Sequence, residues 1–112
     1  MNMDYPNYLR KLEWLVPWCP VDSELDLQLK KEVGWGHPLY VQKAIAVGRR
    51  SDSDDVLFYL PDYSAPLAVV HLTWSDAPGP EPMFPWTVVY SSLEEWVDQC
   101  MKPDYVEYAR GR

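Results

Sequence analysis

The chain contains few of the residues that build common catalytic and metal-binding motifs. It has two cysteines, two histidines and five glycines among 112 residues. Cys19 and Cys100 are far apart, and no C-x2-C pair occurs, so the pattern excludes a zinc ribbon and predicts free thiols. There is no glycine-rich phosphate loop and no G-x-S-x-G nucleophile elbow. The sequence therefore predicts no metal centre, no cofactor and no catalytic residue.

Basic residues and long apolar runs are also scarce. Ten Lys and Arg stand against 17 Asp and Glu, which gives a net charge of −7. This charge repels nucleic acids and anionic membranes, and no stretch approaches the ~20 apolar residues of a membrane span. The first ten residues lack the apolar region of a secretion signal, so we expect a cytoplasmic protein. The charge permits a basic protein as partner, or it only keeps a small domain soluble.

Aromatic residues and prolines are abundant instead. Aromatics make up 14% of the chain, with six Trp and eight Tyr, and there are 11 Pro. Trp and Tyr combine a large apolar area with a polar group, and they concentrate in cores and at interfaces. We expect residues 1–112 to form a single domain of common size, whose core needs fewer such residues. The excess favours a binding surface.

The spacing of apolar residues predicts an α+β fold. A helix is expected within residues 7–15, and a second begins at a cap on Asp22 or Ser23 and ends before Gly34. Short runs of β-branched and aromatic residues, separated by polar turns, predict an antiparallel sheet of about four strands packed with helices. The expected strands are residues 40–47, 56–60, 67–74 and 87–90.

A C-terminal amphipathic helix is expected after a capping box formed by Ser92 and Glu95. Its apolar residues recur at helical spacing and form one face. They are Leu93, Trp96, Val97, Cys100 and Met101. Pro103 is expected to end the helix, and the tail from about residue 104 is expected to be frayed.

Two segments are candidates for protein binding. The proline-rich loop, residues 75–85, lies between two tryptophans, and its prolines restrict the backbone to few conformations. An acidic turn follows the first strand of the sheet, and it can steer a basic partner or be a solvated turn. The candidate residues are Asp52, Asp54, Asp55, Trp74, Asp76, Phe84 and Trp86. Alternatively, Met83 and Phe84 fold back and cap the sheet, and the prolines of the loop only prevent edge pairing.

Two other functions remain open. His71 and Thr73 alternate along the strongest strand, and they could line a pocket of a small ligand-binding domain or an enzyme. A single histidine in a strand is also typical of a structural residue. The third possibility is a homodimeric structural subunit that pairs a sheet face or edge across a two-fold axis.

Several short motifs resemble those of a family of small uncharacterised bacterial proteins. They include DDVLF at 54–58, VHLTWS at 70–75 and PWT at 85–87, and the resemblance covers most of residues 35–101. It implies no activity. In general character, a small, acidic, aromatic-rich domain is also similar to the immunity proteins that neutralise bacterial toxins. The leading hypothesis is therefore a non-enzymatic, cytoplasmic protein-binding domain of the immunity or inhibitor type.

Overall fold

A computed structural model, which describes residues 5–21 and 23–111, shows an α+β fold built on one antiparallel sheet. Its five strands follow one another in space in chain order, and each pairs antiparallel with the next. The strands are β1 (Trp18–Pro20), β2 (Ile45–Arg50), β3 (Asp55–Tyr59), β4 (Leu67–His71) and β5 (Thr87–Tyr90). The helices are α1 (Asn7–Arg10), α2 (Leu25–Glu32) and α3 (Leu93–Trp96), which continues through the π-helical turn η1 (Val97–Met101) into α4 (Lys102–Arg110).

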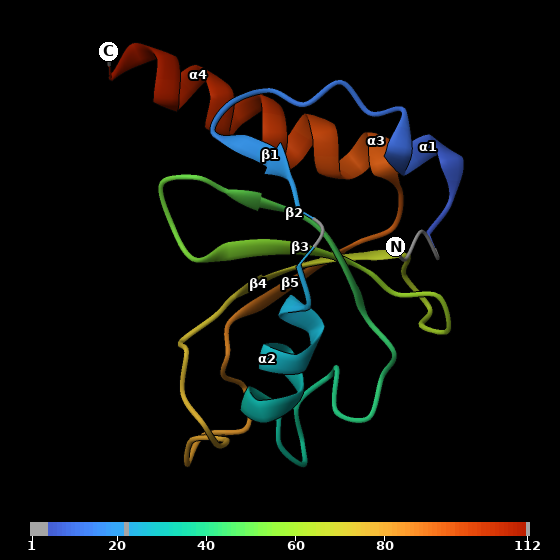
Figure 1. Ribbon diagram of the computed structural model, residues 1–112, viewed down its shortest axis with the longest axis vertical. Helices are drawn as coiled ribbons and strands as arrows, with labels where there is room; N and C mark the ends of the chain where they lie inside the picture. The colour runs from blue at the N-terminus through green and yellow to red at the C-terminus, as the bar shows by residue number, and fades with distance from the viewer. Residues whose placement is uncertain (1–4, 22, 112) are drawn as a thin grey trace.

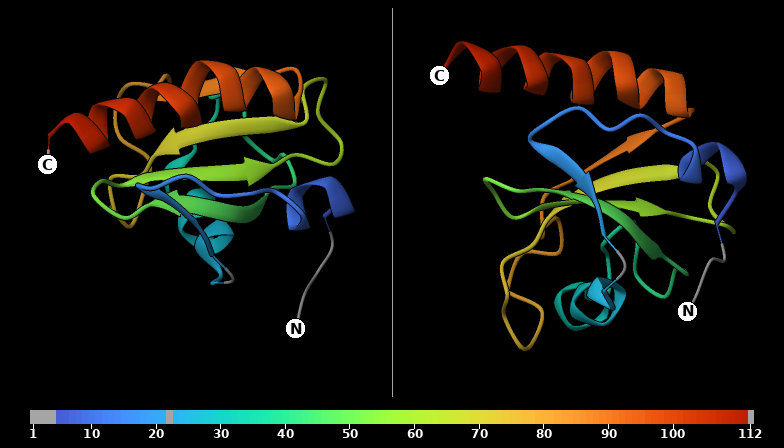
Figure 2. Two further views of the ribbon diagram at one scale, coloured as in Figure 1. Left: turned by 90° about the horizontal axis from the view of Figure 1, so that it is seen from above. Right: turned by 45° about the horizontal axis from the view of Figure 1, so that its top comes forward.

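The sheet is covered on both faces (Figures 1 and 2). Alternate residues of β3 point to opposite sides, so Val56 and Phe58 pack toward α2, whereas Leu57 packs toward the C-terminal helix. On that second side, Trp96 and Met101 are buried together with the N-terminal segment. Burial of both faces explains the near-continuous apolar runs of β3 and β4.

The sheet differs from the expected one at three places. It has five strands rather than four, because Trp18–Pro20 pairs with the end of β2 as an additional edge strand. The strand expected at 40–47 starts only at Ile45, since residues 38–41 form turns instead. The strand expected at 67–74 ends at His71, because the neighbouring strand β3 begins opposite it at Asp55. Trp74, three residues later, lies in the left-handed region at φ 64°.

The C-terminal helix begins at the expected Ser92 cap and extends further than expected. The Ser92 hydroxyl accepts the N–H of Glu95, and the Glu95 carboxylate accepts the N–H of Ser91. Pro103 does not end the helix, and the tail is helical to Arg110 rather than frayed. The wide turn of η1 shifts the hydrogen-bond pattern just before Pro103, so the proline ring falls in the first turn of α4, where a missing N–H costs little.

Helix α2 starts later than its expected cap. Glu24 is its N-cap and makes no side-chain capping bond; Ser23 precedes it, and Asp22 lies outside the described residues. The helix ends at Glu32, whose side chain is buried against the segment after β4. No helix in the part of the chain that the structure describes is long and apolar enough to cross a membrane.

Candidate functional site

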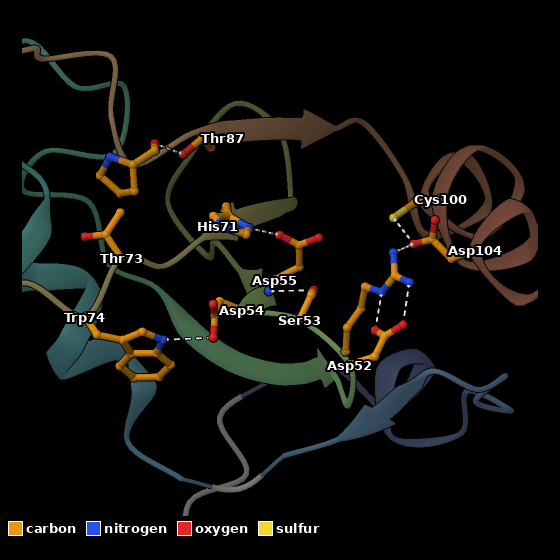
Figure 3. Close-up of polar contacts among 12 residues, drawn as sticks. Asp52, Ser53, Asp54, Asp55, His71, Thr73, Trp74, Thr87, Cys100 and Asp104 are labelled. Carbon is orange, nitrogen blue, oxygen red and sulfur yellow. Dashed lines mark hydrogen bonds and ion pairs between the residues drawn. The ribbon is translucent and has the colours of Figure 1, made fainter. Parts of the chain in front are cut away.

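Most of the predicted site residues gather at one end of the sheet. Since β3 begins where β4 ends, the register places Asp55 opposite His71. The β5 strand begins beside the same end, where the His71 N–H donates to the Trp86 carbonyl at 2.9 Å. The acidic turn and both ends of the proline-rich loop therefore lie close together, as Figure 3 shows for several of these residues.

Each carboxylate of the acidic turn has a partner within the chain (Figure 3). The two carboxylate oxygens of Asp52 accept hydrogen bonds from Nε and Nη2 of Arg50, at 2.9 and 3.0 Å. Asp54 accepts the indole N–H of Trp74 at 3.0 Å, and Asp55 lies 2.7 Å from His71 Nδ1. The acidic turn therefore shapes this end of the sheet, and the Asp54 contact ties the turn to the start of the proline-rich loop.

Glu32 anchors the start of the proline-rich loop. This residue is only 2% exposed. It accepts four hydrogen bonds: the N–H and hydroxyl of Thr73 and the N–H of Trp74, each at 2.8 Å, and the amide of Gln28 at 2.7 Å. The Gln28 amide also donates to the Ser75 carbonyl. These bonds hold Trp74 in its left-handed conformation, which is unfavourable for a residue with a bulky side chain.

His37 anchors the other end of the loop. This buried histidine accepts the Leu39 N–H on Nδ1 at 3.0 Å, so the proton of the neutral ring is on Nε2. Nε2–H then donates to the Pro85 carbonyl at 2.9 Å, and the Thr87 hydroxyl donates to the same oxygen. The loop is thus fixed at both ends by buried polar side chains from the α2 region.

The middle of the loop packs on two glycines. A Cβ at Gly34 or Gly36 would lie 2.9 Å from the Cβ of Pro78 or Pro82, respectively, which is too close for a carbon contact. The segments meet around a shallow cleft of about 290 Å³, lined on one side by Trp35 and on the other by the loop. The glycines therefore allow the loop to lie directly on residues 34–36.

Several aromatic side chains remain exposed around this packed loop, and we call three of them the aromatic surface: Trp35, Phe84 and Trp86. Trp35 is 84% exposed, Trp86 58% and Phe84 43%. Trp35 and Phe84 line the same shallow cleft, and the rings of Phe84 and Trp86 are 6.5 Å apart. The expected alternative, in which Met83 and Phe84 fold back and cap the sheet, does not hold, because Met83 is 57% exposed and Phe84 43%.

The other predicted site residues are more dispersed. Asp76 lies on the exposed part of the loop. His71 and Thr73 do not face a common pocket, because Thr73 turns to Glu32 on α2 while His71 lies against Asp55. Neither lines the shallow cleft beside the loop or the cleft between α2 and residues 39–45. Among residues 5–21 and 23–111, no group of three His, Cys, Asp or Glu side chains could hold a metal ion.

Cys100 is a poor candidate for a nucleophile. Burial, and next the nearby Asp104 carboxylate, raise the pKa of its thiol to about 12. The thiol donates to Asp104 at 3.6 Å. The same Asp104 oxygen accepts the indole N–H of Trp18 and lies 3.4 Å from the Arg50 guanidinium. Cys100 thus belongs to the contacts that fix α4 to β1 and β2.

We expect Cys100 to resist alkylation in the folded protein. An unfolded thiol has a pKa of about 8.5, so at pH 8 a thiol with a pKa near 12 contains roughly a thousandfold less reactive thiolate. Mass spectrometry of iodoacetamide-treated protein, native and in urea, should show that Cys100 is alkylated far more slowly in the native protein. Equal alkylation rates in the native and the urea-unfolded protein would contradict the raised pKa of the Cys100 thiol.

The free energy of unfolding should also decline from pH 8.5 towards pH 12. The reason is that the Cys100 thiol ionises at a lower pH in the unfolded chain than in the folded protein.

Sequence reasoning missed three residues of this site. Glu32 has the spacing of a solvated residue in the last turn of a helix, and His37 and Trp35 stand in a glycine-containing segment that suggests a flexible loop. Only the tertiary contacts show that Glu32 and His37 are buried. No protein-family model, curated protein or solved structure matches the chain. The resemblance to a small bacterial family remains a prediction.

Proposed function

We propose that this protein is a non-enzymatic protein-binding domain of the inhibitor or immunity type, which receives a basic protein on its aromatic surface. The observation that carries the proposal is the exposure of Trp35, Phe84 and Trp86 around a loop that is fixed at both ends. Trp and other aromatic anchors dominate binding energy at protein interfaces. A surface fixed before binding loses less conformational entropy when the partner binds.

The charge of the domain favours a basic partner. The net charge is −7, and Asp54, Asp76 and Glu81 lie on or beside the proline-rich loop. In this proposal Trp74 and Asp54 extend the contact area, while Asp52 and Asp55 contribute mainly to the long-range field because each is paired within the chain. Such a field accelerates association at low salt more than it raises affinity.

The test is capture of partners from a lysate of the source cells with matched surface variants. We expect one basic protein to be retained at stoichiometric amounts by the unmodified domain and less at high salt. Trp86→Ala should lose it, whereas Tyr105→Ala, at a similarly exposed aromatic on α4, should retain it. Equal retention by both variants, or a partner that is acidic, would contradict the proposal.

One contact favours the alternative of a small-ligand site or enzyme. His71 Nδ1 lies 2.7 Å from Asp55, and the imidazole side chain is 53% exposed, which is how a carboxylate orients a histidine base. His71→Gln separates the two functions. If the domain is a binding protein, this variant should fold and should still bind the protein partner. Loss of a measured ligand or activity, with binding of the protein partner unchanged, would favour the alternative.

A further inference from the structure

A second and larger cleft lies between α2 and residues 39–45. Its volume is about 620 Å³, within the range of small-molecule sites. None of the residues of the aromatic surface lines it. It is therefore separate from the aromatic surface, and the proposed binding of a protein partner does not involve it.

The floor of this α2 cleft is apolar. It is formed by Leu29 and Val33 of α2 and by Leu39 and Ala44 of the facing segment. All four belong to the core cluster that fills the space between α2 and the sheet. An apolar ligand chain in the cleft would therefore extend the hydrophobic core.

The rim of the cleft is positively charged, although the protein as a whole is acidic. Lys30 and Lys43 line it, and Asp26 is the single carboxylate among its lining residues. In the described parts of the chain, neither ammonium group lies within 4 Å of a carboxylate. Two cations above an apolar floor match a ligand with an anionic head and an apolar body.

The wall of the cleft contains a strained residue. Val41 has a φ of 58° and is 83% exposed. A β-branched residue in the left-handed region is unfavourable, and the sequence around it favours an extended strand. Residues 39–42 instead form a turn that lines the cleft together with α2. Strain of this kind concentrates at ligand-binding sites.

We propose that the α2 cleft binds a small monocarboxylate with an aliphatic chain. The carboxylate lies between Lys30 and Lys43, and the chain lies on the floor formed by Leu29, Val33, Leu39 and Ala44. The phenol of Tyr40 and the amide of Gln42 stand at the same cleft and supply further hydrogen-bond donors to the head group.

The test uses octanoate and octan-1-ol as probes, which share the chain and differ in the head group. Titration of the protein, followed by amide chemical shifts, should show shifts confined to α2 and residues 39–45. Octanoate should bind about tenfold more tightly than octan-1-ol because of its charge-assisted contacts. Lys30→Gln with Lys43→Gln should remove that difference, whereas Lys31→Gln, at an exposed lysine that does not line the cleft, should not.

Absence of shifts, equal binding of the two probes, or an unchanged preference in the double lysine variant would overturn the proposal. Ala44→Leu, which fills the floor, should abolish octanoate binding; if it does not fold, the lysine variants decide. Trp86→Ala should bind octanoate as the unmodified protein does. The two proposals therefore succeed or fail separately.

Discussion

Replacing Glu32 with alanine should lower the free energy of unfolding by about 2–4 kcal/mol, since each unsatisfied buried donor costs roughly 1–3 kcal/mol. The carboxylate is buried and accepts the backbone N–H groups of Thr73 and Trp74 as well as the amide of Gln28. Without it, these donors lose their partner and Trp74 loses a bond that holds its unfavourable backbone conformation. Equilibrium urea unfolding measures the change through the midpoint at constant slope.

Two variants control for the loss of charge and of volume. Glu32→Gln keeps the shape but turns an amide N–H toward donors, so it should still cost about 2 kcal/mol. Glu107→Gln removes one charge from the exposed face of α4 and should change stability by no more than about 0.5 kcal/mol. If Glu32→Ala, Glu32→Gln and Glu107→Gln all unfolded at the same urea concentration, Glu32 would not be the anchor of the loop.

Replacing Trp96 with alanine should cost about 3–5 kcal/mol, which is typical of removing a large side chain from a core. Trp96 is fully buried, and its ring meets those of Trp14 and Trp18 edge to face at 6.0 and 5.2 Å. It joins the C-terminal helix to the N-terminal segment and the sheet. Collapse around so large a cavity is limited because the neighbouring rings are themselves fixed.

Replacing Trp18 or Trp96 with phenylalanine should distinguish the contribution of packing to stability from that of the indole hydrogen bond. Among the residues that the structure describes, the indole N–H of Trp96 has no hydrogen-bond partner, whereas that of Trp18 donates to Asp104 at 2.8 Å. Trp18→Phe loses a bond to a charged group, so it should cost about 2 kcal/mol more than Trp96→Phe. Thermal unfolding of both variants tests this order, and a larger loss for Trp96→Phe would contradict it.

The sequence predicted those parts of the fold that depend on local patterns. The bounds of β5 and the Ser92 cap of the C-terminal helix are as expected, because neighbouring residues determine both. β1 was missed as a strand, since three residues including Pro20 form a strand only by pairing with β2. The helix beyond Pro103 was also missed, because it depends on the wide turn of η1.

The candidate site was predictable only in part. The sequence indicated exposed aromatics on a stiff loop, and Phe84 and Trp86 are exposed there. The link between the acidic turn and the loop, through Asp54 and Trp74, requires the register of the sheet. Burial of Glu32 and His37 follows from long-range packing, which no local pattern of charges or glycines indicates.

The most direct test of the proposed function is the affinity of the captured partner for the domain and for its double variant Phe84→Ala with Trp86→Ala. Both side chains are exposed in the free domain, so their removal should leave the fold intact. Each hot-spot residue contributes at least about 2 kcal/mol, so the double variant should bind roughly 1000-fold more weakly when the two losses add. A dissociation constant that is unchanged, in a variant that unfolds like the parent, would show that the partner binds elsewhere.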